Sequence, residues 1–197
     1  MRSGIVAPSQ MTAGVPGAGR EARISRIRGF SRWMAAGCLV TSALLAAGML
    51  FYWIATPAPV LLGQSGVRYD PGIDLDISRR AMAFAISMVP LGALIFGLLS
   101  ARRCFAGFAM GRIFTPQSIG SLQAFSLGIA ASAILRPLAG AALSVLLSWD
   151  GPKGEKTFAL IIGSDSLIAL IFAGIVAAFA WIMAEAVEIS DENNQFV

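Results

Sequence analysis

The chain has 197 residues, of which 56% are hydrophobic, and its formal net charge is +4. It contains no histidine, which removes the most common metal ligand and the usual acid–base group near neutral pH. Its basic residues flank apolar segments instead of gathering on a folded face, so direct binding of nucleic acid is not expected.

Residues 1–29 are predicted to form a disordered basic tail, because Gly, Ala, Ser, Pro and Arg dominate them without apolar periodicity. A cleaved signal peptide is a weaker alternative, because the next apolar run is long for such a peptide and is followed by no clear cleavage site. Residues 30–197 are predicted to form one four-helix transmembrane domain, since no stretch between the spans is long enough for a separate soluble domain.

Four apolar segments are long enough to cross a bilayer, whose hydrocarbon core of about 30 Å requires roughly 20 helical residues. Backbone N–H and C=O groups find no water partner in lipid, so each segment must be helical. We therefore predict an all-α membrane protein with the lipid bilayer as its surroundings. The predicted spans are about 33–54, 81–100, 122–147 and 166–184.

The two loops on the side away from the termini contain short alternations of polar and apolar residues, at 67–69, 73–77 and in part of 156–162. A period of two residues is typical of β-strands. A small β cap formed by these two outer loops is therefore an additional expectation.

Basic residues near the ends of the spans favour a cytoplasmic position for both termini, because cytoplasmic loops retain positive charge. The termini side carries Arg20, Arg23, Arg26, Arg28, Arg32, Arg102, Arg103 and Arg112, and the other side carries Arg68, Arg79, Arg80, Lys153 and Lys156. Aromatic residues are expected at the two membrane interfaces, with Phe51, Tyr52, Trp53 and Trp149 outside and Trp33 and Trp181 inside.

The loop between the second and third spans ends in Thr115-Pro116, a good helix start. The threonine hydroxyl can accept from free backbone N–H groups, and proline suits the first helical position. The third helix should therefore begin several residues before the lipid. This loop lies on the side of the membrane that carries the termini, and its candidate binding residues are Arg102, Arg103 and Arg112.

The loop and the C-terminal segment carry a resemblance to a known family. Residues 111–116, Gly-Arg-Ile-Phe-Thr-Pro, and the tail Ala184–Val197 resemble the domain-of-unknown-function family 2975, and the similarity covers roughly Trp33–Val197. It implies a bacterial four-span membrane protein, placed in the cell (inner) membrane, with no established activity and no catalytic residues. Some members resemble the membrane half of a gene pair whose other half encodes a small helix-turn-helix regulator.

Arg136, followed by Pro137, is the only ionisable residue well inside a span. A buried arginine costs at least about 2.5 kcal/mol on insertion scales, so it should face protein or water. It could form a polar centre for an anion, a lipid headgroup or a proton-linked step, or be satisfied by carbonyls and a neighbouring helix. Ser164 or Asp165 can cap the fourth helix, and capping is the expected role of Asp165, which lies about two turns shallower than Arg136. A direct pair between them is the less favoured alternative.

Glu185, Glu188 and Glu192 fall on one face of a helix that continues past the inner boundary of the membrane. A solvated or arginine-paired face is favoured over a divalent-cation site, because no other oxygen ligands are fixed nearby. Cys38 and Cys104 lack the spacing of a zinc or redox pair. No metal, cofactor or catalytic residue is therefore expected.

Two pairs of small residues spaced four apart, Gly128 with Ser132 and Gly174 with Ala178, predict close helix contact. The function predicted is accessory or regulatory, through the cytoplasmic loop and the acidic tail acting on a cytosolic regulator protein. A small transporter or channel with Arg136 in its polar centre is the alternative. Self-association into a homo-oligomer is also open, whereas an enzyme is not expected, because no nucleophile–base or metal constellation is present.

Overall fold

The computed structural model describes residues 18–57, 76–112, 115–147 and 163–195, and within these ranges the chain forms four helices. They are α1 (Ala18–Ala55), α3 (Ile77–Ala109), α4 (Pro116–Leu147) and α5 (Ser164–Gln195). Each contains an apolar stretch long enough to cross a bilayer. The prediction of four membrane-spanning helices is thereby confirmed.

The start of the first helix differs from the sequence prediction. Helix α1 begins at Ala18, so residues 18–29, which we assigned to the basic tail, are helical, while residues 1–17 lie outside the described residues. The expected β cap is not supported: its loops, 58–75 and 148–162, fall outside the described residues, which contain no strand. Helix α1 begins before its apolar segment. Its arginine-rich first turns lie outside lipid but form the same backbone hydrogen bonds as the apolar turns that follow.

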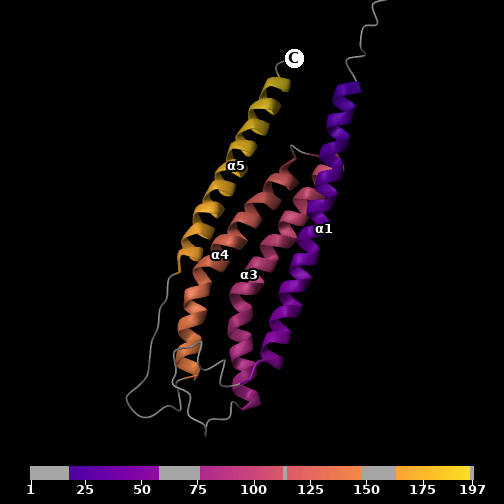
Figure 1. Cartoon of the computed structure of the whole chain (residues 1–197). Coiled ribbons are helices and arrows are strands. Elements are labelled where there is room, and N and C mark those ends of the chain that lie inside the picture. The colour runs from indigo at the N-terminus through magenta and orange to yellow at the C-terminus, as the bar shows by residue number, and fades with distance from the viewer. Residues whose placement is uncertain (1–17, 58–75, 113–114, 148–162, 196–197) are drawn as a thin grey trace, which may run out of the picture.

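The helices form a row in chain order, in which each runs antiparallel to the next (Figure 1). Helix α1 packs against α3, α3 against α4, and α4 against α5. The start of α1, the α3–α4 connection and the end of α5 lie at one end of the bundle, called here the termini end (Figure 1). Helix α5 starts part-way along the row, and both α1 and α5 extend past the α3–α4 connection (Figure 1).

Small residues fill the interior of this row, and large apolar ones face outward. Ala83, Ala101 and Ala180 are at most 3% exposed, whereas Trp33 and Trp181 are at least 74% exposed. This inversion of a soluble core is expected in lipid, where apolar side chains gain nothing from burial and close backbone approach provides the packing energy.

The closest approach joins α3 to α4 at two glycines. A Cβ atom placed on Gly128 would lie 2.6 Å from the Cα atom of Gly97 and 2.9 Å from the carbonyl oxygen of Ala93. Both neighbours are backbone, which cannot swing away as a side chain would. The prediction of close contact at Gly128 is therefore confirmed, whereas Gly174, in the second pair, has open space at its Cβ position.

A larger side chain anchors the opposite end of the bundle. Trp53 of α1 is 6% exposed and packs with Ala83 of α3, and Leu143 and Leu146 of α4 join the same cluster. Nearby, Nη2 of Arg80 donates to the carbonyl oxygen of Thr56 at 2.6 Å. These contacts hold α1, α3 and α4 together at the end of the bundle that α5 does not reach. Trp53 is buried against α3, and its expected place at the outer membrane interface stays a prediction.

Candidate functional site

A cavity of about 600 Å³ opens between the helices in the half of the bundle away from the termini. All four helices contribute to its wall, and two of its residues are charged, Arg136 of α4 and Asp165 of α5. Polar groups face it from Tyr52, Ser87 and Ser132. The two charges that the sequence placed about two helical turns apart therefore share one cavity.

The position of Asp165 follows from where α5 begins. Because α5 starts part-way along the row, beside the middle of α4, its first turn lies at the depth of the cavity (Figure 1). The N-terminus of a helix carries a partial positive charge, so an aspartate in this turn is favourable. The expected cap is absent: within the described residues the Asp165 carboxylate accepts no hydrogen bond.

Arg136 has an exposed side chain, at the wall of the cavity. Among the described residues it forms neither a hydrogen bond to a carbonyl nor an ion pair with Asp165. An arginine without a protein partner at this depth needs water or an anion, because its insertion into lipid costs at least about 2.5 kcal/mol. The cavity provides the space for either.

Two prolines shape the same region. Pro90 lies inside α3 and Pro137 inside α4, and both helices bend part-way along their length (Figure 1). Proline removes one backbone hydrogen bond and clashes with the preceding turn, which bends the helix. Pro90 is buried and lines the cavity, and Pro137 follows Arg136 directly. The bends therefore occur where the cavity opens.

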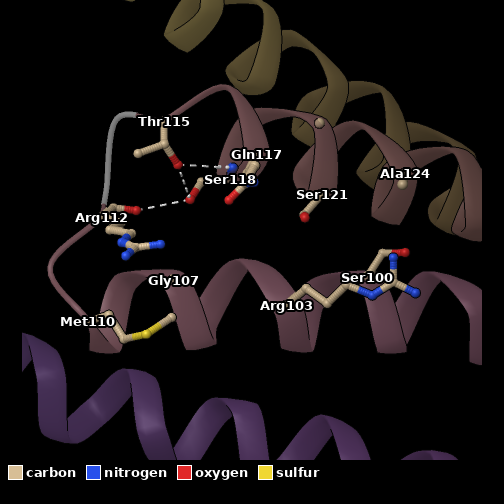
Figure 2. A pocket seen from close by; sticks show the side chains of 11 residues that line it. Ser100, Arg103, Gly107, Met110, Arg112, Thr115, Gln117, Ser118, Ser121 and Ala124 are labelled. Carbon is tan, nitrogen blue, oxygen red and sulfur yellow. Dashed lines mark hydrogen bonds between the residues drawn. The ribbon is translucent and has the colours of Figure 1, made fainter.

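A second cavity, of about 410 Å³, lies at the termini end between α3 and α4 (Figure 2). Arg103, Arg112 and Thr115, three of the candidates from the sequence, line it. Arg102, which precedes Arg103, is exposed, and neither Arg102 nor Pro116, the first residue of α4, is among the lining residues.

The turn that closes this cavity is set by local chemistry. Gly111, two residues after the end of α3, has a φ of +82°, a left-handed conformation that glycine adopts without steric cost. The Thr115 hydroxyl accepts from the backbone N–H of Ser118 at 3.3 Å and donates to its hydroxyl at 3.0 Å (Figure 2). Ser118 in turn donates to the carbonyl oxygen of Arg112 at 2.9 Å. The predicted helix start at Thr115-Pro116 is confirmed.

Glu185 and Glu188 of α5 do not line this cavity. Glu185 and Glu188 are exposed, and in the described part of the chain neither forms an ion pair with Arg102, Arg103 or Arg112. The side chain of Glu192 lies outside the described residues. Helix α5 packs against α4, so its acidic end stands apart from the arginines of α3.

Sequence reasoning missed the serines of both cavities. Ser87 and Ser132 line the central one, and Ser118 and Ser121 line the one at the termini end. Ser118 and Ser121 are three apart, which places both on one face of the first turns of α4. This spacing in the sequence could have identified Ser118 and Ser121 as neighbours. No sequence spacing relates Ser87 to Ser132, because only helix packing brings them together.

Comparison with known proteins supports the family that the loop and the tail suggested. Residues 65–197, more than half of the chain, match the model of the family described as "Protein of unknown function (DUF2975)". The match begins at residue 65, so α1 lies outside it. A search of curated proteins and a search of solved structures give no match. The chain, a multi-pass membrane protein by its four apolar helices, belongs to the family of proteins of unknown function DUF2975.

Proposed function

We propose that this protein is an accessory or regulatory membrane protein whose termini end binds a cytosolic regulator protein. The observation that carries the proposal is the extension of α1 and α5 past the α3–α4 connection (Figure 1). At 1.5 Å per residue, the 38 residues of α1 span about 57 Å, well beyond a hydrocarbon core of about 30 Å. The extra turns therefore lie in water, where a soluble partner can reach them.

The charges on the two extensions differ in sign. Arg26 of α1 is exposed, as are Glu185 and Glu188 of α5. Complementary charge steers association and selects partners, while a few apolar anchors supply most of the affinity. Exposed Ile189, one position after Glu188, supplies an apolar contact next to the acidic face. This combination suits a protein surface better than a small substrate.

The proposal includes a bacterial inner-membrane location with both termini in the cytoplasm. The arginines of α1 and of the α3–α4 region support this orientation, because positive charge is retained on the cytoplasmic side. The proposed role is binding and not catalysis. The alternative partner is a second copy of this chain.

Charge reversal on α5 tests the proposal. A photo-crosslinking residue at position 189 should capture a cytosolic protein in cells, and Glu185→Arg with Glu188→Arg should reduce its recovery by at least about tenfold by removing favourable charge pairs. Quantitative mass spectrometry measures the recovery, and expression of neighbouring genes reports its consequence. Because both side chains are exposed and unpaired with described residues, membrane abundance should not change.

The matched control is Asp76→Lys, an exposed acid at the opposite end of the bundle, which should leave recovery unchanged. A reporter fused after Val197 must show a cytoplasmic C-terminus. Capture of this chain alone would favour the homo-oligomer, and equal recovery from all variants would contradict a docking role for α5.

The central cavity favours a second candidate function, that of a small transporter or channel. Its walls combine Arg136 and Asp165 with hydroxyl groups, and an unpaired guanidinium at this depth attracts anions. Chloride efflux from vesicles containing the protein should exceed that from empty vesicles, and Arg136→Leu should return it to the empty-vesicle rate without loss of insertion. Arg102→Leu is the control, because Arg102 lies outside the cavity. Efflux from wild-type vesicles at the empty-vesicle rate would rule against transport of this anion.

A further inference from the structure

The cavity at the termini end is lined by positively charged residues. Arg103 lines it from α3 and Arg112 from the turn before α4; the Arg112 guanidinium points into the space between the two helices, and the Arg103 side chain runs along α3 toward Ser100 (Figure 2). No acidic side chain occurs among the described residues that line it. Arginine stays charged at every physiological pH, so the two like charges must be offset by an anion or by water.

A third arginine reaches the same turn from α1. Nη2 of Arg28 lies 3.2 Å from the position that a Cβ atom on Gly111 would take. The absence of a side chain at Gly111 therefore lets α1 bring its guanidinium against the α3–α4 connection. Arg28 of α1 thereby adds positive charge beside the turn that carries Arg112.

Hydrogen-bond donors complete the wall. The Ser121 hydroxyl faces the space between α3 and α4 (Figure 2) and has no partner among the described residues. Helix α4 begins at this wall, and the positive end of its dipole adds to the field of the arginines. Planar guanidinium groups with a nearby hydroxyl suit a tetrahedral oxyanion, because each oxygen accepts short, charge-assisted hydrogen bonds.

We propose that this cavity binds a phosphate group, carried by an anionic lipid headgroup or by a small phosphate ester. Its volume of about 410 Å³ is many times the roughly 30 Å³ that one water occupies in the liquid, so a phosphate with part of its alcohol fits. Arg103 lies in the last turns of a membrane-spanning helix, within reach of headgroups. The proposal does not depend on the partner-binding role.

The test uses the full chain and two probes. Inorganic phosphate is titrated by calorimetry, and phosphatidic acid is offered in phosphatidylcholine nanodiscs, with native mass spectrometry counting the retained lipid. Wild-type protein should bind at least one probe at a single saturable site. Arg103→Gln with Arg112→Gln should weaken that binding by at least about tenfold, because two charge-assisted contacts are lost.

Arg102→Gln is the matched control, since it removes a neighbouring arginine that does not line the cavity. It should leave the affinity within about twofold, because phosphate contacts are made by the lining arginines. Ser121→Leu keeps every charge but removes the hydroxyl donor and narrows the cavity, so it should also weaken binding, and circular dichroism checks that each variant remains helical. This variant keeps the test decisive if the double variant misfolds.

The probes separate the two sources of phosphate. Saturable inorganic phosphate without lipid retention identifies a soluble ester, lipid retention alone identifies a headgroup, and both together identify a site that recognises phosphate itself. Binding of neither probe would overturn the proposal. An equal loss in Arg102→Gln would do so as well, because it would reveal only general attraction to positive charge.

Discussion

Replacing Gly128 with leucine should separate α3 from α4 and destabilise the bundle by at least about 3 kcal/mol, the upper part of the range for overpacking. The reason is geometric: a Cβ atom on residue 128 would lie 2.6 Å from the Cα atom of Gly97. Neither backbone can yield without a shift of the whole helix. Thermal unfolding in detergent measures the loss, and Gly97→Leu should have a related but smaller effect, because its Cβ position is 3.2 Å from the carbonyl oxygen of Phe125.

Gly174→Leu provides the matched control. Gly174 is also a helical glycine in a membrane span, but nothing lies within 4 Å of its Cβ position. Leucine there should be neutral or slightly stabilising, because glycine costs roughly 1 kcal/mol in a helix relative to a good helix former. A Gly128→Leu variant that unfolds at the wild-type temperature would show that α3 and α4 do not pack as described.

Trp53→Ala should cost about 3–5 kcal/mol, the usual range for removing a large buried aromatic side chain. Trp53 is 6% exposed and packs against Ala83, so the indole leaves a cavity between α1, α3 and α4 that small neighbours cannot fill. Because α1 has its principal packing against α3, this loss should loosen α1 first. Proteolysis of α1 in detergent and the unfolding midpoint both report the change.

Two control variants accompany the measurement on Trp53→Ala. Trp33→Ala should change stability little, since its side chain is 80% exposed in the bundle. Trp53→Phe should cost less than about 1.5 kcal/mol, because it keeps an aromatic ring and removes an indole N–H that has no hydrogen-bond partner in the described residues. Equal losses from Trp33→Ala and Trp53→Ala would contradict the buried position of Trp53.

The candidate sites were only partly predictable. Arg103 and Arg112 were identified from the sequence, but nothing in the sequence separated Arg103 from its neighbour Arg102. Adjacent residues on a helix point about 100° apart, so only the position of α4 decides which of them lines the cavity. Arg136 was identified as a polar centre because charge in a long apolar segment stands out in any sequence.

Only the tertiary structure shows that Arg136 and Asp165 line the same cavity. Counting residues from an assumed common membrane boundary placed Asp165 two turns shallower than Arg136. The fold starts α5 part-way along the row instead, which brings both residues to one cavity (Figure 1). The depth at which a helix starts is set by its packing against α4, and hydropathy contains no measure of it.

The sequence by itself determined the number of membrane-spanning helices and the start of α4. These features depend on local properties: uninterrupted apolar residues, the need of each backbone group in lipid for an internal partner, and the Thr115-Pro116 cap. Only the tertiary structure decided which small residue forms a contact, which tryptophan is buried and which arginines converge. Those outcomes depend on the rotation and offset of each helix relative to its neighbour. Lipid is as apolar as the helix surfaces, so it does not favour one rotation or offset over another.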